Sequence, residues 1–135
     1  MLSPDHLDLT LTALKKNGVK YKKAASVKNL DLEKIKFSEN LPPGIPFVVD
    51  KATVFLVAVD RDAILVREGI DAMPVDFQCQ LPSVDGCNYQ TAAEAQLPEP
   101  IRSLRIERGF IAIDAKIAGK AYRIFNTHLE VKGKI

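Results

Sequence analysis

RGFIAIDAKIAGKAYRIFNTHL, residues 108–129, is the stretch of sequence that decides the fold. Residues alternate along both of its halves in the period of two that predicts strands, joined here by a turn around Gly119. Apolar residues occur on both faces of the two strands, which is typical of the middle of stacked sheets. In an antiparallel pair the start of the first strand lies beside the finish of the second. We therefore expect Arg108 and residues 126–128 to share one rim of the sheet.

The length of the turn decides whether Arg108 and His128 share a face of this hairpin. A two-residue turn at Ala118 and Gly119 places Gly109 opposite His128 and puts Arg108 on the other face. A three-residue turn over residues 118–120, with positive φ in a bulge, places Arg108 on the face of His128. A joint site for the two side chains requires the three-residue arrangement.

The run FNTHLE at residues 125–130, with Arg-Gly-Phe at 108–110, resembles the endonuclease/exonuclease/phosphatase superfamily, the deoxyribonuclease-I-like phosphodiesterases. The resemblance extends weakly upstream to Tyr21 and to the run DRDAILVR at residues 60–67, which follow the order and approximate spacing of that family's middle third. It implies an α+β fold, part of a four-layered α/β/β/α sandwich with mainly antiparallel strands and few helices. We expect residues 1–135 to form one incomplete domain of this kind.

The resemblance also implies roles for the polar residues of the hairpin. Phosphodiester hydrolysis needs a cation for the non-bridging oxygens and a proton donor for the leaving alkoxide. Arg108 would contact the phosphate, and His128 would contact the phosphate or act as the acid. Asn126 and Thr127 would supply supporting hydrogen bonds.

Two further positions follow from the family pattern. A carboxylate from the run at residues 60–62 would orient His128, with Asp60 as the first choice and Asp62 as the second. Turn chemistry alone also explains these acids. Tyr21 would lie on the substrate side, although a half-buried strand tyrosine explains it equally simply.

Enzymes of this family use a divalent metal, Mg²⁺ or Mn²⁺, held by residues that come before and after the segment found here. The sequence has no Gly-Asp-x-Asn and no Ser-Asp-His, so we expect a middle fragment without metal ligands of its own. The expected function is that of a phosphoric ester hydrolase-like domain, truncated and weak or inactive alone. The alternative is a non-catalytic binding or structural remnant that acts as an oligomerising module.

Composition limits the partners and the compartment. The chain has 135 residues, 47% of them hydrophobic, with 27% charged residues and a net charge of +2. This balance does not favour nucleic acid or a membrane surface, and a phosphate ester remains the expected substrate class. There is no basic, apolar leader and no apolar window of spanning length. The sequence as written predicts a cytoplasmic protein, and secretion of a parent protein is left open.

The rest of the chain predicts one helix, several strands and long loops. Residues 3–17 have helical spacing of leucines, with Ser3 or Asp5 as the cap and Asn17-Gly18 as the stop. The expected remaining elements are a half-exposed edge strand at 19–28, a loop at 41–46, a strand buried on both faces at 53–59, a turn at 60–62, a buried strand at 63–66, and mostly loop at 68–100 apart from an apolar strand at 75–81.

Cys79 and Cys87 are open to two interpretations. They flank a turn-rich segment and could form a disulfide, or Cys79 could be a buried thiol on the inward face of a strand. An incomplete sandwich would also leave strand edges and apolar faces uncovered. We therefore expect a homo-oligomer that buries these edges.

Overall fold

The structure of the chain is a computed structural model that describes residues 5–79, 82–83, 86–96 and 103–129. These residues form mostly antiparallel strands, one α-helix and one short 3-10 helix, which confirms the expectation of mainly antiparallel strands with few helices. None of the helices in this part of the chain is long and apolar enough to cross a membrane. The elements are α1 (His6–Lys16), β1 (Tyr21–Asp31), η1 (Leu32–Lys34), β2 (Ile45–Val49), β3 (Ala52–Leu56), β4 (Val59–Arg67), β5 (Asp71–Pro74), β6 (Pro82–Ser83), β7 (Gly86–Gln96), β8 (Ser103–Ile117) and β9 (Lys120–Thr127).

β8 is the central strand of the larger sheet. One of its edges pairs with β9, and the other pairs with β7 and β5 at successive positions along the strand. β6 pairs with β7 beyond them. β1 and β4 form a separate antiparallel pair, and β2 and β3 form a third. The long strand β8 therefore joins four other strands into one sheet.

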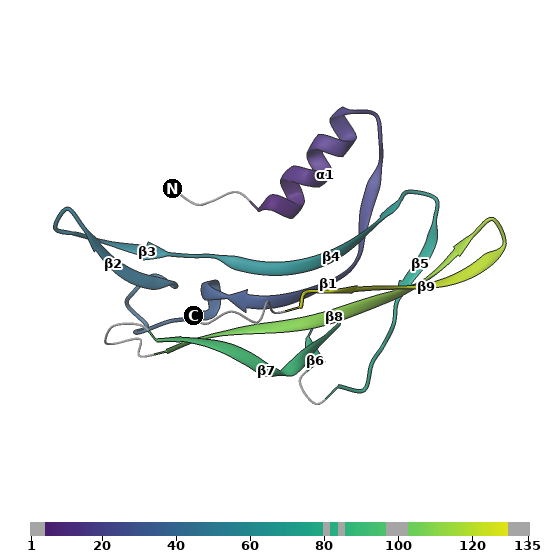
Figure 1. Cartoon of the computed structure of the whole chain (residues 1–135). Helices are drawn as coiled ribbons and strands as arrows, with labels where there is room; N and C mark the ends of the chain where they lie inside the picture. Colours follow the sequence, from purple (N-terminus) through teal and green to yellow (C-terminus); the bar gives the residue numbers. More distant parts are fainter. Residues whose placement is uncertain (1–4, 80–81, 84–85, 97–102, 130–135) are drawn as a thin grey trace.

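The core lies between the β1–β4 pair and the centre of β8. Both layers present buried side chains to each other, and α1 lies on the far side of the β1–β4 pair from β8 (Figure 1). The order of layers is therefore helix, sheet, sheet. Each fully buried isoleucine of this core contributes on the order of 1.5–3 kcal/mol through burial of its side chain. The core residues are Ala25, Val27, Ile64, Val66, Ile111, Ile113 and Ala115.

α1 begins and ends where the sequence predicts. The side chain of Asp5 caps the helix by accepting a hydrogen bond from the Leu7 amide at 2.9 Å, and Gly18 follows the end with a φ of +76°. Ser3, the other predicted cap, lies outside the described residues. Asp5 also makes an ion pair with Arg61 of β4 at 2.9 Å. This contact fixes the start of the helix against the outer face of β4.

The hairpin of β8 and β9 has a two-residue turn, so the three-residue arrangement that a joint site was expected to require is wrong. Ile117 pairs with Lys120, and Ala118 and Gly119 between them both have positive φ. Such a turn matches the right-handed twist of the flanking strands. Across the hairpin, Arg123 donates two hydrogen bonds of 2.7 Å to Asp114, which hold the pKa of Asp114 below its ordinary value.

The sequence misassigned four segments, at residues 53–59, 60–62, 68–100 and 75–81. The strand expected at residues 53–59 to be buried on both faces is β3, in which Val54 and Leu56 are 44% and 49% exposed. The expected turn at 60–62 is wrong because these residues lie within β4 and pair with β1. The expected loop at 68–100 contains β7, an eleven-residue strand. An apolar run does not tell how many neighbouring strands a strand has. Charged residues can lie inside a strand when its backbone pairs with a neighbouring strand.

Two other expectations for the strands are confirmed. β1 pairs only with β4 among the described residues and is an edge, and the strand at 63–66 forms the buried part of β4. The strand expected at 75–81 is wrong over its described part, because residues 75–79 have no regular structure; residues 80 and 81 lie outside the described residues.

A disulfide joins Cys79 to Cys87, with a Cα–Cα distance of 5.8 Å, and so decides between the two interpretations of the cysteines. Cys87 lies in β7 opposite Phe110 of β8. The bond keeps the segment before Cys79 on the outer face of the larger sheet, where the ring of Phe77 lies edge-on against Phe110, 5.1 Å between centroids. The segment therefore acts as a strap over β8.

Replacing Ala118 with Asn should stabilise the protein by about 0.5–1 kcal/mol, because Asn adopts positive φ more readily than Ala in this turn. Equilibrium urea unfolding measures the change. Gly119→Ala is the matched control and should destabilise the protein. Destabilisation by Ala118→Asn, or no destabilisation by Gly119→Ala, would contradict the two-residue turn.

Replacing both cysteines with Ser should lower the free energy of unfolding by about 2–3 kcal/mol, the value for closing a short loop. Denaturant unfolding of the double variant and of the wild type, each with and without a thiol reductant, measures the effect. The reductant should lower the stability of the wild type alone. A wild type that does not respond to the reductant would show that the strap is not held covalently.

Candidate functional site

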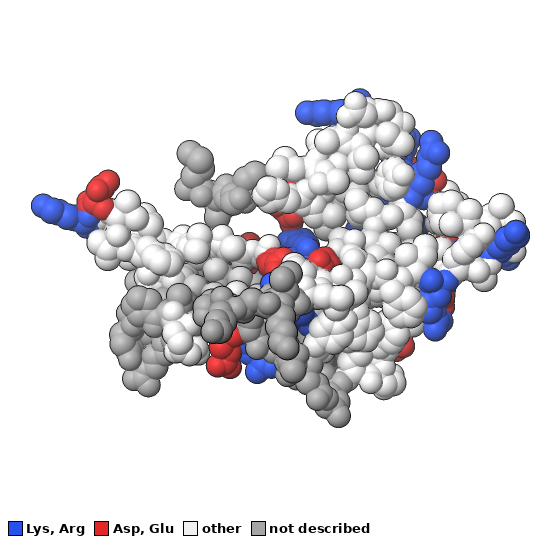
Figure 2. All heavy atoms as spheres, viewed as in Figure 1, with Lys and Arg blue, Asp and Glu red and all other residues white. Residues whose placement is uncertain are grey.

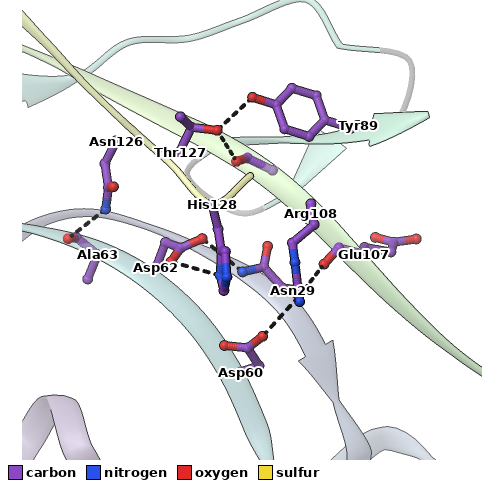
Figure 3. Close-up of polar contacts among 11 residues, drawn as sticks. Asn29, Asp60, Asp62, Ala63, Tyr89, Glu107, Arg108, Asn126, Thr127 and His128 are labelled. Carbon is purple, nitrogen blue, oxygen red and sulfur yellow. Dashed lines mark hydrogen bonds and ion pairs between the residues drawn. The ribbon is translucent and has the colours of Figure 1, made fainter. Parts of the chain in front are cut away.

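The inner faces of the two sheets become polar at one end of the core. On β4 the buried Ile64 is preceded on the same face by Asp62 and Asp60, and on β1 the buried Val27 is followed by Asn29. Figure 2 shows a small group of acidic and basic side chains near the centre of this face, with uncharged side chains on one side of it. Most other charges on this face lie at its margins. This polar end is the candidate site, and its residues are drawn in Figure 3.

Asp60 faces Arg108 across the two sheets. The Nη1 atom of Arg108 lies 3.3 Å from Oδ2 of Asp60 and donates a hydrogen bond to the backbone carbonyl of Glu107 at 3.2 Å. The side chain of Arg108 is 18% exposed and that of Asp60 is 41% exposed. Asp60 also lines an open cavity of about 810 Å³ between α1 and the start of β4. The ion pair therefore lies partly buried beside an opening to solvent.

Asp62 faces His128, and this corrects the first choice of Asp60 for that role. The Nδ1 atom of His128 lies 3.8 Å from Oδ1 of Asp62, while Oδ2 of Asp62 accepts a hydrogen bond of 2.8 Å from Asn29. The side chain of Asp62 is 18% exposed and the imidazole is 44% exposed. Asp62, the second choice in the sequence analysis, is thus the carboxylate beside His128.

Asn126 and Thr127 fix the end of β9 that leads into His128. Asn126 donates a hydrogen bond to the Ala63 carbonyl of β4 at 3.2 Å, which connects the two sheets. Thr127 donates to the Gly109 carbonyl at 3.0 Å and contacts the Tyr89 hydroxyl at 2.6 Å (Figure 3). The sequence predicted supporting hydrogen bonds from Asn126 and Thr127. Both side chains donate these bonds to backbone carbonyls of the protein.

Arg108 reaches the site in spite of the two-residue turn. The register places Gly109 opposite His128, whose amide donates to the Gly109 carbonyl at 3.4 Å. Strict alternation would then direct Arg108 to the outer face. The β7–β8 ladder is irregular beside Arg108, and the guanidinium lies on the side of β4 (Figure 3). Arg108 and His128 therefore meet carboxylates two residues apart on one strand, roughly 7 Å along it.

Tyr21 lies away from this group. It pairs with Arg67, seven positions along β4 from Asp60, which is roughly 23 Å at the usual rise per residue. The structure brings together Arg108, Asp60, Asp62 and His128, and it does not bring Tyr21 to them.

The residues of the site do not fit a divalent metal ion. Among the described residues, no three His, Cys, Asp or Glu side chains are grouped so as to hold one. Asp60 faces a guanidinium, and the two oxygens of Asp62 face an amide and an imidazole. A hard cation would have to displace these partners to gain oxygen ligands. We derive no chemistry from a metal in this chain.

Sequence reasoning missed two members of the site, Asn29 and Tyr89. Asn29 follows Ala25 and Val27 on the inward face of β1, and a polar residue that continues an apolar stripe was a signal that could have identified it. Tyr89 lies in a segment that was expected to be mostly loop, and nothing in its spacing connects it with Thr127.

Comparisons with protein-family models, with curated proteins and with solved structures find no match to this chain.

Proposed function

We propose that this chain is part of a phosphoric ester hydrolase of the deoxyribonuclease-I-like type, weak or inactive alone, with Arg108 and His128 on the phosphate side. The observation that carries the proposal is the convergence of these two side chains on Asp60 and Asp62 of β4. They come from β8 and from the end of β9, and they meet where the apolar core ends.

The chemistry of phosphate ester cleavage suits this pair of groups. A guanidinium offers planar donors that match two phosphate oxygens. An imidazole whose Nδ1 faces a carboxylate keeps Nε2 available, where it can give a proton to a leaving alkoxide. Arg108 would thus neutralise charge on the phosphate while His128 assists departure of the leaving group.

The arrangement of layers supports the same proposal. The order of helix, sheet and sheet agrees with three layers of an α/β/β/α sandwich (Figure 1). An incomplete domain of that architecture is part of what we propose.

The local charges explain why activity should be weak in this chain. Asp60, Asp62 and Arg108 sum to one negative charge when His128 is neutral. A phosphate must therefore compete with Asp60 for Arg108 and approach a second carboxylate. Removal of Asp60 should relieve this competition, and removal of Arg108 should abolish the attraction.

Asp60→Asn should strengthen the binding of inorganic phosphate about two- to fivefold, the gain expected when one partly exposed ion pair no longer competes. Arg108→Ala should weaken it by about tenfold or more. NMR titration with phosphate measures both, because the imidazole signals of His128 can be followed against those of His6 on α1. Unchanged binding in both variants would show that phosphate does not use Arg108.

Hydrolysis of a phosphodiester with added Mg²⁺ or Mn²⁺ tests the chemical step in the same set of proteins. Any turnover by this chain should disappear in His128→Ala and in Arg108→Ala while both variants stay folded by circular dichroism. Turnover that persists in both would place the activity elsewhere.

A second candidate function is an oligomerising module without catalysis, and the exposed apolar side chains favour it. In the β2–β3 ribbon Phe47, Val48 and Val49 are 44%, 77% and 52% exposed. On β9, Ile124 and Phe125 are 41% and 59% exposed, and the strand pairs only with β8 among the described residues. Such edges and patches commonly become interfaces.

Sedimentation equilibrium should show a self-associating protein whose mean mass rises with concentration. Val48→Lys and Phe125→Lys place a charge on each exposed surface, and the variant that shifts the protein toward monomer identifies the surface used. A clean monomer at high concentration would remove the oligomer from the proposal.

A further inference from the structure

Asn29 ends the inward stripe of β1, where the buried side chains change from apolar to polar. It is 2% exposed and is the one polar residue that the structure buries within the part of the chain it describes. Ala25 and Val27, on the same face, are fully buried. A buried amide is unfavourable unless its hydrogen bonds are made. The position therefore needs an explanation other than packing.

The backbone of β1 is irregular at this residue. Lys28 pairs with Arg61 and Leu30 pairs with Asp60, so Asn29 is an extra residue without a partner in the ladder. Such a bulge bends the strand and re-aims a side chain, and bulges are common beside functional sites. Here the bulge lies opposite the segment of β4 that carries the two carboxylates of the site.

Among the described residues, the amide of Asn29 makes its hydrogen bond with Asp62. Nδ2 donates to Oδ2 of Asp62 at 2.8 Å, while Oδ1 of Asp62 faces Nδ1 of His128 at 3.8 Å. The two oxygens of one carboxylate thus have different partners, one in each sheet. Figure 3 draws both contacts, one from each oxygen of the Asp62 carboxylate.

The other end of the amide, the buried Oδ1 atom, contributes no hydrogen bond within the described residues. An unpaired buried acceptor is destabilising, and an apolar residue would continue the stripe of Ala25 and Val27 without that cost. What Asn29 provides is a fixed donor to Asp62.

We propose that Asn29 is a positioning residue for His128, acting through Asp62. The amide holds the Asp62 carboxylate so that Oδ1 faces the imidazole, and this favours the tautomer with its proton on Nδ1 and a free Nε2. The inference rests on the proposed function for the use of that Nε2 atom on a phosphate ester. The orientation itself can be measured without any substrate.

Nitrogen-15 NMR of the imidazoles tests the inference directly. At pH about 9, well above the ordinary imidazole pKa of about 6.5, the nitrogen shifts report the ratio of the two neutral tautomers. We expect His128 to favour the Nδ1–H form, with His6 as the internal reference for a surface imidazole. Asn29→Leu, which removes the donor, should lower the ratio for His128 about fivefold and leave His6 unchanged.

A matched variant separates orientation from loss of stability. Ile113→Val removes a methyl group from the buried core between the sheets, outside the polar end that holds the site. It should lower the melting temperature and leave the tautomer ratio of His128 near the wild-type value. An equal shift of the ratio in both variants, or no shift in Asn29→Leu, would overturn the inference.

A smaller substitution keeps the test decisive if Asn29→Leu does not fold. Thr is favourable in a strand, so Asn29→Thr should fold. The Thr side chain is shorter, and its hydroxyl cannot reach Asp62 as the amide does. It should reduce the ratio in the same direction, and a wild-type ratio would again overturn the inference. Titration with inorganic phosphate then tests the proposed function separately. An imidazole that is correctly oriented but insensitive to phosphate would contradict that function alone.

Discussion

The close approach of β1 to the strands of the larger sheet is the constraint on which the rest of the structure depends. A Cβ atom at Gly109 would lie 2.5 Å from the Cys87 carbonyl and 3.1 Å from a methyl group of Val27, and one at Gly86 would lie 3.3 Å from Cβ of Val27. At both positions a Cβ atom would also press against residues of the larger sheet, so glycine allows both that sheet and Val27 to pack this closely. Because the two sheets meet so closely there, the next residues, Arg108 and Asn29, reach the carboxylates of β4.

The local part of the fold could be predicted from the sequence, and the partners of each strand could not. The helix, the closing hairpin and the buried strand at 63–66 follow from periodicity and turn residues that act over short distances. The placement of residues 53–56 in an exposed ribbon depends on which strand lies beside them, and their apolar composition does not encode that. The charges at 60–62 were misread for the same reason, because β1, which pairs with them inside the strand, lies about thirty residues earlier in the chain.

For the site, the residue types were predictable and their pairing was not. Arg108, His128 and a carboxylate from residues 60–62 do lie together, but Asp62 rather than Asp60 faces the imidazole. Arg108 reaches them through an irregularity in the β7–β8 ladder that has no sequence signature. The position of Asn29 depends on a β-bulge in β1. The bulge can be recognised only when the residues of both paired strands are known.

The order in which β8 finds its neighbours has a consequence for the speed of folding. Its pairing with β9 closes a turn of two residues, whereas its packing against Val27 of β1 joins parts of the chain more than eighty residues apart. Contacts over such separations form late, because the entropy of closing the loop is lost before the contact is gained. The hairpin should therefore form early, and the candidate site, which needs β1, β4 and β8 together, should be assembled in the last and slowest step.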